Sequence, residues 1–255
     1  FRYEKELSDV LENAQLTVYE GEIISLLGGN GSGKTTLLKV VSGTCKPYRG
    51  KIEIFGKRLK KYTGNKLYVG NLAFLPQNPQ TVFIKMSVRE DYDEIRKVMG
   101  YTKEEMREKT EEMAETLGIS HLLDRHPYDL SGGEQQKAAI GKVLLLKPRL
   151  LLMDEPTKGM DAWSKRQLRL LLEKLQEKGI SILMVTHDVE FAAEVSDRCG
   201  LFFDHEITSL DTPEAFFGNN NFYTTAANRI SRGRYENAVT CEEVIKICKK
   251  NGRIK

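Results

Sequence analysis

The sequence predicts an α/β fold with a mostly parallel sheet, and three observations carry this prediction. Apolar runs of strand length alternate with helical patterns through the second half of the chain. A glycine-rich loop joins an early apolar run to a helical pattern, and a stretch before the middle shows helical patterns alone. Because alternating strands and helices are typical of parallel sheets covered by helices, we interpret the all-helical stretch as an insertion.

The first third of the chain is rich in predicted strands. Residues 1–27 are expected to form strands on either side of a turn at Gly21, and the run Ile23–Leu27 is largely apolar. The other elements expected here are a helix over 37–41 that ends at Gly43 and short strands at 51–55 and 71–75.

Residues 87–130 are predicted to be all-helical. Ser87 with Glu90, and Thr102 with Glu105, match the capping box that begins a helix. The second box opens a pattern with its apolar side chains on one helical face: Met106, Met113, Ala114 and Leu117. Methionines at this spacing indicate core packing more often than a binding groove, so a small packed insert is expected.

Strand and helix patterns alternate after the insert. Residues 150–153 are wholly apolar, which indicates a strand buried on both faces. The expected elements around it are helices over 133–146 and 168–175, the second followed by Gly179, a strand at 180–185, a helix over Val189–Val195 and a strand at 201–203. Beyond residue 211 the sequence predicts short helices, and the last begins with the capping box of Thr240 and Glu243.

Composition places the chain among folded proteins. Its 255 residues correspond to one or two domains, and 40% hydrophobic content suffices for a core, which excludes wholesale disorder. No apolar run approaches the ~18 residues of a membrane-spanning helix. The cysteines fit no zinc or CxxC spacing, so reduced thiols are expected at Cys45, Cys199, Cys241 and Cys248.

The net charge of +3 is small, but the charges are unevenly distributed. Residues 46–70 hold eight basic residues and one acidic residue, whereas residues 87–118 hold ten acidic and six basic residues. Solvated surfaces explain such biases most often. A basic surface that faces anionic lipid or nucleic acid is the weaker alternative.

Residues 28–35 match the pattern G-x-x-x-x-G-K-[ST] between a strand and a helix, which is the context of a phosphate-binding loop. Glycines let the backbone wrap a phosphate chain with its N–H groups directed inward, and the following helix adds its N-terminal partial positive charge. Lys34 can reach the β- and γ-phosphates, and the Thr35 hydroxyl can bind Mg²⁺.

Two carboxylates follow the buried strand at 150–153. Ligands bind at the carboxyl ends of strands in open parallel sheets, so Asp154 and Glu155 are expected at such an edge. Asp154 suits an outer contact to Mg²⁺, and Glu155 is placed to polarise a water that attacks the γ-phosphate.

Residues 130–136 read Leu-Ser-Gly-Gly-Glu-Gln-Gln and predict a second anion site. Ser131 can cap the helix that follows, and Gly132 and Gly133 leave backbone N–H groups open to a phosphate. These residues alone do not explain why one chain needs two anion sites.

The chain resembles the ATP-binding cassette (ABC) ATPases over nearly its whole length, because these motifs occur in that family's order. Gln77 resembles the Q-loop glutamine, and residues 157–161 resemble the D-loop. His187, within Thr-His-Asp at 186–188, resembles the H-loop histidine, and Tyr3 matches the aromatic residue that stacks on adenine.

The resemblance implies a role for each matched residue. ATP would be bound by Tyr3, Gly28, Asn30, Gly31, Ser32, Gly33, Lys34, Thr35 and Thr36. Glu155, His187 and Gln77 would act in catalysis, and Thr35, Gln77 and Asp154 would hold Mg²⁺. Because two cassettes of this family pair head to tail, Ser131, Gly132 and Gly133 would contact ATP held mainly by a partner cassette.

The resemblance also implies an organisation for the whole chain. It comprises a P-loop nucleotide-binding core with a mostly parallel sheet, an N-terminal antiparallel β subdomain and an inserted all-helical subdomain. The expected boundaries are 1–86 and 131–211 for the core with its β subdomain, 87–130 for the helical insert, which ends at the signature motif, and 212–255 for a C-terminal helical extension.

A finer resemblance is to the ATPases of cobalt and energy-coupling-factor importers. In these proteins Gln-Asn-Pro, here 77–79, is followed by a V-x-x-D segment, here 88–91. Residues 222–229 and 238–240 resemble the second cassette of fused two-cassette members, and the start at Phe1 fits a fragment cut from such a chain. One departure is Lys-Gly-Met-Asp at 158–161, where many members have a small residue before Gly-Leu-Asp.

We therefore expect an ATP-hydrolysing motor domain at the cytoplasmic face of the membrane, which pairs with a second cassette and with transmembrane transporter subunits. The apolar residues Val82, Phe83, Ile84 and Met86 are expected either to dock a helix of such a subunit or to fill the junction between subdomains. The alternative functions are an ABC-type ATPase not involved in transport and a cassette that binds ATP for regulation alone. No nucleic-acid partner is expected.

Overall fold

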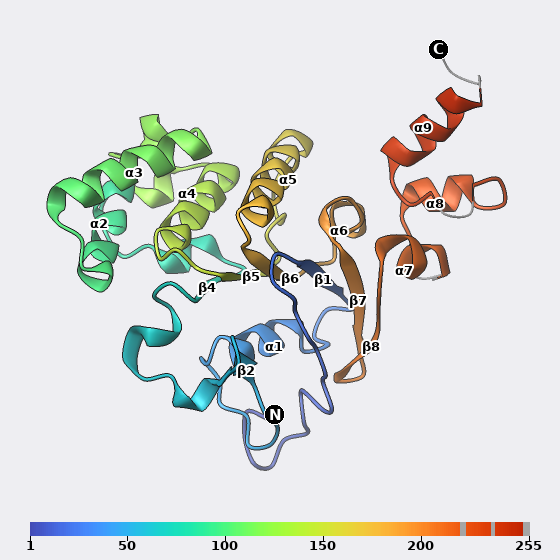
Figure 1. Ribbon diagram of the computed structural model, residues 1–255, viewed down its shortest axis with the longest axis horizontal. Coiled ribbons are helices and arrows are strands. Elements are labelled where there is room, and N and C mark those ends of the chain that lie inside the picture. The colour runs from blue at the N-terminus through green and yellow to red at the C-terminus, as the bar shows by residue number, and fades with distance from the viewer. Residues whose placement is uncertain (220–222, 236–237, 252–255) are drawn as a thin grey trace. The chain divides into compact units, whose positions relative to one another are not determined.

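The computed structural model describes residues 1–219, 223–235 and 238–251 (Figure 1). Within these ranges the chain forms two compact units, Phe1–Thr36 with Gln167–Lys255 and Leu37–Arg166. The chain passes from one unit to the other within two helices, α1 (Lys34–Val41) and α5 (Ala162–Glu177). Residue 222, which belongs to the segment 222–229 that was compared with fused two-cassette proteins, lies outside the described residues.

The first unit is built on strands in the order β6-β1-β7-β8. Their bounds are β1 (Ile23–Leu27), β6 (Ser181–Val185), β7 (Arg198–Phe203) and β8 (Glu206–Asp211). Strand β1 lies between β6 and β7 and is parallel to both, and β8 is antiparallel to β7. Every residue of β1 and β6 is buried, which explains why both strands are apolar runs rather than alternating patterns.

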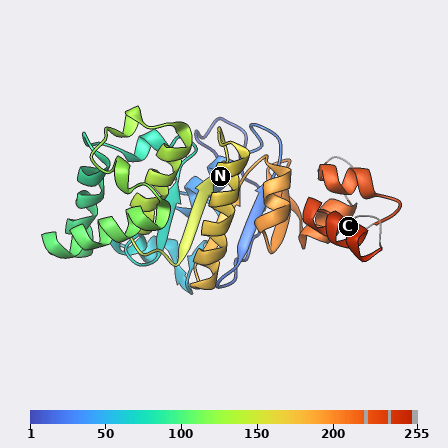
Figure 2. The same ribbon diagram turned by 90° about the horizontal axis from the view of Figure 1, so that it is seen from above.

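Helices cover this unit and form its C-terminal part. They are α6 (Val189–Val195), α7 (Pro213–Asn219), α8 (Ala226–Ser231) and α9 (Cys241–Lys250). One core cluster joins β1, α6, β7 and α7: Leu27, Ala192, Ala193, Cys199, Phe216, Phe217 and Val239. Arg169 of α5 pairs with Glu173, with Glu194 of α6 at 3.3 Å and with Glu242 of α9 at 3.5 Å, so it ties the last helix to the unit. Figure 2 shows α7, α8 and α9 from above.

The second unit contains a parallel strand pair, a small antiparallel pair and three long helices. The strands are β4 (Leu72–Leu75), β5 (Leu150–Asp154), β2 (Glu53–Ile54) and β3 (Lys57–Arg58). The helices are α2 (Val88–Met99), α3 (Lys103–Leu117) and α4 (Gly132–Leu144). Short 3₁₀ helices lie at Leu59–Lys61, Gly64–Leu67, Pro79–Val82, Ser120–Leu122 and Pro127–Asp129.

Helices α2, α3 and α4 pack closely on one another, as the green ribbons of Figure 1 show. Gly141 of α4 makes the approach possible, because a Cβ there would lie 2.1 Å from the hydroxyl oxygen of Tyr92 and 2.8 Å from Leu117. Tyr92 is fully buried and donates to the Ala138 carbonyl at 2.8 Å, so its polar end is satisfied inside the helical core.

The structure confirms the predicted α/β class, with a mostly parallel sheet and a separate antiparallel pair. The all-helical character expected for 87–130 is also observed, and Thr102 with Glu105 forms a complete capping box. At Ser87 the box differs from the prediction: its hydroxyl accepts from Glu90, but the Glu90 carboxylate accepts from the Met86 N–H.

One expectation about strands was wrong, and one strand was missed. Residues 1–22, all of which are described, form no strand, because their backbone makes turns and loop bonds such as Phe1 N to the Leu11 carbonyl at 2.7 Å. Strand β8 was not expected. It follows a two-residue turn in which Asp204 and His205 both have positive φ. Glycine is the usual sequence signal of such a turn, and neither position is a glycine. No helix in the described ranges combines the length and apolar character needed to cross a membrane.

Candidate nucleotide-binding site

The loop between β1 and α1 needs glycine at two positions. A Cβ on Gly28 would lie 2.3 Å from the carbonyl oxygen of Phe202 in β7. Gly33 has φ +114°, and a Cβ there would lie 2.8 Å from the carbonyl oxygen of Val10. Because no larger residue fits either position, the loop can run close to its neighbours and turn its backbone N–H groups toward a ligand.

Lys34, at the start of α1, is folded back over this loop. Its side chain is buried, and Nζ donates to the carbonyl oxygens of Gly28 at 2.9 Å and Gly29 at 2.8 Å. The Ser32 hydroxyl oxygen is buried and has no hydrogen-bond partner among the described residues. A held ammonium group and an unsatisfied hydroxyl in one loop suit an anion with several acceptor oxygens, such as a phosphate chain.

Tyr3 lies beside the first turn of α1. Its hydroxyl is 2.9 Å from Thr36 Oγ1, and the residue as a whole is 53% exposed. The Phe1 ring meets it edge to face with 5.0 Å between the ring centres. An exposed aromatic ring anchored next to the phosphate loop is available for stacking on a planar base.

His187 lies at the same sheet edge as the phosphate loop. Strands β1 and β6 are parallel, with Leu26 opposite Val185, and the Thr186 N–H donates to the Leu26 carbonyl at 3.1 Å. The next residue, His187, is exposed, and Asp188 then caps α6 by accepting from the Phe191 N–H at 3.1 Å. The carboxyl ends of two neighbouring parallel strands therefore carry the loop and the histidine.

In the second unit, β4 and β5 bring Gln77 and two acids to one sheet edge. The strands are parallel, with Leu75 opposite Met153. Asp154 and Glu155 follow Met153 directly, and both are buried. Glu155 has φ +50°, a left-handed conformation that is uncommon for a residue other than glycine. A strained acidic residue at the end of a buried strand is typical of a functional position.

Gln77 is exposed two residues after β4, and its neighbours connect it to α4. Asn78 begins the next 3₁₀ helix, with its side chain accepting from the Gln80 N–H at 3.1 Å. The Gln80 side-chain amide donates to the Gln135 side chain of α4 at 3.4 Å, and Gln135 in turn donates to the Pro127 carbonyl.

Ser131 stands immediately before α4 and is exposed. Its backbone N–H and its hydroxyl both donate to Oε2 of Glu134, at 2.9 and 2.7 Å. These two bonds hold the pKa of the Glu134 carboxyl below its ordinary value. Gly132 is exposed as well, so the helix start is open on its outer side.

The start of α4 packs against the segment that follows Glu155. A Cβ on Gly133 would lie 3.2 Å from the Ser164 hydroxyl, and one on Gly132 would lie 4.0 Å from the Gly159 carbonyl. Asp161 accepts from the Ser164 N–H at 2.7 Å, and this bond lowers the pKa of Asp161. Gly132 and Gly133 are therefore close neighbours of Gly159 and Ser164 within the second unit.

Comparison with known proteins identifies the family to which this chain belongs. The family model described as "ABC transporter" matches residues 11–158, which is more than half of the chain. The chain belongs to the ABC transporter family. It is an ATPase domain of that family, and the resemblance inferred from the motifs is confirmed.

Relatives and solved structures place this cassette more closely. It is 39% identical over 249 residues to an ABC transporter ATP-binding protein of Bacillus thuringiensis, covering 97% of this chain but 44% of the relative. It is 36% identical over 182 residues to the energy-coupling factor transporter ATP-binding protein EcfA1 of Mycoplasma pneumoniae, covering 71% of this chain and 66% of EcfA1. The chain thus spans less than half the length of its Bacillus relative.

Among solved structures, CbiO1 from Clostridium perfringens, described as part of the ABC transporter complex CbiONQ, superposes with a TM-score of 0.77 at 27% identity, covering 86% of this chain and 88% of CbiO1. The cassette MJ0796, solved as a dimer bound to ADP and Pi, gives 0.76 at 26% identity, covering 84% of this chain and 94% of MJ0796. The resemblance to the cobalt and energy-coupling-factor type is therefore confirmed.

The predicted residues fall into two groups, each within one unit of the cassette. The first unit brings together the phosphate loop, Tyr3, Thr36 and His187. The second brings Asp154 and Glu155 to the strand edge that Gln77 follows, and joins the signature residues, 131–133, to residues 157–164.

Sequence reasoning missed two side chains of the site. Glu134 holds Ser131, and the spacing Ser-x-x-Glu at 131–134 is a capping-box pattern that could have revealed it. The Ser164 side chain packs against Gly133, and no sequence pattern predicts that contact.

The apolar set after Gln77 divides in two. Phe83 is buried, whereas Ile84 is 73% and Met86 is 72% exposed. Phe83 is therefore part of the buried core of the second unit, whereas Ile84 and Met86 are open to solvent. Beside them a hollow of about 580 Å³ lies between α2 and α3, with Lys85, Glu94 and Met106 among its lining residues.

The donor set expected for Mg²⁺ suits that ion. Thr35, Gln77 and Asp154 offer a hydroxyl, an amide oxygen and a carboxylate, and Mg²⁺ prefers oxygen ligands. The described residues contain no group of three His, Cys, Asp or Glu side chains that could hold a metal ion by itself.

Proposed function

We propose that the complete protein hydrolyses ATP to drive import of a solute across a membrane, as the motor of an energy-coupling-factor type importer. The observation that carries this proposal is the placement of Glu155, buried and strained at the end of β5, where an acidic group can act on a water. A regulatory cassette that only binds ATP would not need such a residue. The similarity to EcfA1 and CbiO1 supports the importer class.

In this proposal the first unit binds the nucleotide. Tyr3 stacks on adenine, the N–H groups of residues 28–33 and the Ser32 hydroxyl bind the phosphates, and Thr36 supports the loop. Asn30 and Gly31 line the same loop. Lys34 exchanges the two loop carbonyls for β- and γ-phosphate oxygens, which bind an ammonium group more strongly than neutral carbonyls do. Mg²⁺ supplies charge neutralisation between the phosphates when it is bound.

Catalysis is assigned to Glu155, with His187 and Gln77 beside the γ-phosphate. Glu155 accepts a proton from the attacking water or polarises it. His187, exposed at the end of β6, donates to the γ-phosphate, and Gln77 orients the water and helps to hold Mg²⁺ with Thr35 and Asp154.

A second cassette completes the site in this proposal. Ser131, Gly132 and Gly133 bind the γ-phosphate of ATP held by the partner, since they form an exposed helix start. The partner is either an identical chain or the first half of a fused chain. The 44% share of the Bacillus relative that this chain covers is consistent with a fused arrangement.

The membrane subunits are proposed to dock on the helical part of the second unit, which would place the motor at the cytoplasmic face of the membrane. Ile84 and Met86 supply apolar contact, and the hollow between α2 and α3 supplies charges of both signs. The division into a core over 1–86 and 131–211, a helical subdomain over 87–130 and an extension over 212–255 is part of this proposal.

Steady-state phosphate release by the complete protein tests the proposal. We expect Mg²⁺-dependent release that rises when the transmembrane subunits are present. Lys34→Ala should abolish it and greatly weaken nucleotide binding, because a preorganised cation contributes much of the stabilisation in phosphoryl transfer.

Three other outcomes would contradict parts of the proposal. Near-normal turnover in Lys34→Ala would remove the phosphate-loop assignment. Tight ATP binding without turnover, even with the membrane subunits, would favour the regulatory cassette. Turnover that never responds to those subunits would favour an ABC-type ATPase outside transport.

A further inference from the structure

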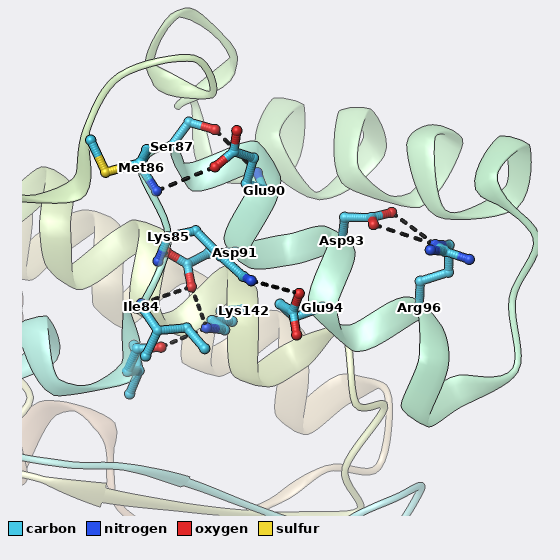
Figure 3. Close-up of polar contacts among 11 residues, drawn as sticks. Ile84, Lys85, Met86, Ser87, Glu90, Asp91, Asp93, Glu94, Arg96 and Lys142 are labelled. Atoms are coloured by element: carbon cyan, nitrogen blue, oxygen red, sulfur yellow. Dashed lines mark hydrogen bonds and ion pairs between the residues drawn. The ribbon is translucent and has the colours of Figure 1, made fainter.

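Asp91 and Lys142 form a buried ion pair outside the nucleotide site (Figure 3). Asp91 of α2 is fully buried, Lys142 of α4 is nearly so, and Nζ lies 2.7 Å from Oδ1. Figure 3 shows both side chains directed at the short segment that precedes α2. A charge at such a position is stable only while its partner and its hydrogen bonds are present.

The pair holds the backbone of residues 82–85. The Asp91 carboxylate accepts from the N–H groups of Ile84 at 3.0 Å and Lys85 at 3.2 Å. Lys142 Nζ donates to the Val82 carbonyl at 2.5 Å and lies 5.9 Å from the centre of the buried Phe83 ring. Three consecutive peptide groups on either side of Phe83 are thus bound to one carboxylate and one ammonium group.

The same segment presents its side chains outward. Ile84 is 73% exposed, although its N–H is bound to a fully buried carboxylate. The side chains of Ile84 and Met86 are therefore open to a partner, while the backbone of residues 82–85 is held by the buried pair. Lys142, which binds the Val82 carbonyl of this segment, belongs to α4. That helix begins at Gly132, directly after Ser131. From residue 132 to 142 the helix is about 15 Å long, and a helix moves as a rigid element over that length.

We propose that Asp91 and Lys142 are a positioning pair that couples residues 82–86 to the signature end of α4. A partner that moves Ile84 and Met86 pulls on the backbone, the pair transfers the displacement to α4, and Ser131 moves with the helix. The inference rests on the proposed function, because Ser131 must act on ATP. Apolar side chains of similar size often stabilise a core as well as a buried ion pair does, so stability alone gives no reason for charges here.

The test breaks the pair in the complete protein and compares turnover with ATP binding. Asp91→Asn and Lys142→Met each remove one charge and keep the approximate shape. We expect kcat to fall roughly 2- to 30-fold, the effect typical of residues that couple two sites, with KM for ATP unchanged. Lys142→Arg keeps the charge and the donors and should retain turnover. Arg96→Met breaks an exposed pair with Asp93 on the same helix and serves as the matched control.

Hydrogen exchange provides a readout that a merely structural pair would not change. MgATP should alter amide exchange in both 82–86 and 131–134 of the parent protein. In Asp91→Asn the response should remain at 131–134 and be lost at 82–86. The double variant Asp91→Asn/Lys142→Met should be no slower than the slower single variant, because both changes break the same connection.

The outcomes separate this inference from the proposed function. If the parent hydrolyses ATP and Asp91→Asn matches it in kcat and exchange, the positioning role is wrong and the proposed function stands. If the parent releases no phosphate, the proposed function fails, and the exchange responses to MgATP still decide the coupling. If both charge-removing variants fail to fold, the pair is structural and the inference is overturned.

Discussion

Ser131 donates two hydrogen bonds to one carboxylate oxygen of Glu134, from its N–H at 2.9 Å and from its hydroxyl at 2.7 Å. A serine hydroxyl has a single proton to donate, so a phosphate that is to receive it competes with Glu134. The Ser131 hydroxyl proton is therefore bound to a carboxylate of its own helix. The same pair of bonds explains why the pKa of Glu134 is lowered.

This relationship predicts a pH dependence. Hydrogen bonds to the charged form lower the pKa of Glu134 from its ordinary 4.5, so the contribution to stability is present above pH 4.5 and is lost as pH falls through the lowered pKa. The amide resonance of Ser131, followed by NMR, should titrate below pH 4.5. Ser131→Ala removes the hydroxyl donor and should move the Glu134 titration back toward 4.5. Identical titration in both proteins would contradict the two-bond arrangement.

The contact of Gly141 with Tyr92 predicts a stability effect. An alanine Cβ at 141 would lie 2.1 Å from the Tyr92 hydroxyl, so the buried phenol must shift. Gly141→Ala should lower the free energy of unfolding by about 1–3 kcal/mol, the usual cost of overpacking, although alanine favours a helix by ~1 kcal/mol. Urea denaturation measures this.

The background variant Tyr92→Phe sharpens the Gly141 test. It removes the atom that alanine would meet, although it also loses the bond to the Ala138 carbonyl. Gly141→Ala should therefore cost less in Tyr92→Phe than in the parent. Equal costs in the two backgrounds would show that the hydroxyl is not what Gly141 accommodates.

Elements with a strong local pattern were predictable from the sequence. The phosphate loop, α1 and the buried strands β5 and β6 each rest on glycine spacing or an apolar run. The structure has both strands within one residue of their expected bounds, and α1 begins three residues before the expected 37–41. The expected placement of Asp154 and Glu155 at a strand end follows from the same local signal.

Features that depend on distant residues were not predictable. The partners Asp91 and Lys142 are 51 residues apart, and no local sequence pattern predicts that they form an ion pair. Phe83 and Ile84 are adjacent and both apolar, yet one is buried and one exposed, because only the packing of the Leu37–Arg166 unit decides between them. The strand predicted near residue 17 is not observed. A run as short as Leu-Thr-Val with polar neighbours fits an extended loop as well as a strand.

Cysteine reactivity provides a prediction about the core of the first unit. Burial raises the pKa of the Cys199 thiol to about 12, so at pH 8 about one molecule in 10⁴ carries the thiolate. Iodoacetamide at about pH 8 should modify the exposed Cys241 and leave Cys199 intact, as mass spectrometry of peptides would reveal. In urea both should react. Modification of Cys199 as fast as Cys241 in the native protein would contradict its place in the core.

The last prediction concerns Glu155 and pairing. Two ATP molecules held between two cassettes should keep them together only until hydrolysis, which needs an acidic group beside the attacking water. Glu155→Gln keeps the shape and the hydrogen-bonding capacity but removes the charge. Turnover should fall by roughly 10²–10⁴, the range for losing a general acid–base group. ATP binding should survive, because Lys34, Thr35 and the loop N–H groups are unchanged.

The variant should then accumulate as an ATP-bound pair of cassettes, whereas the parent pairs transiently. Size-exclusion chromatography with light scattering measures this in ATP without Mg²⁺ and, as a control, in ADP. Adding Ser131→Arg should dissolve the pair, since a bulky side chain takes the space of the partner's γ-phosphate at the exposed start of α4. If Glu155→Gln stays unpaired at high concentration, self-pairing is wrong and pairing with a different cassette is the version left to test. If Glu155→Gln instead hydrolyses ATP at the parental rate, the catalytic assignment itself is wrong.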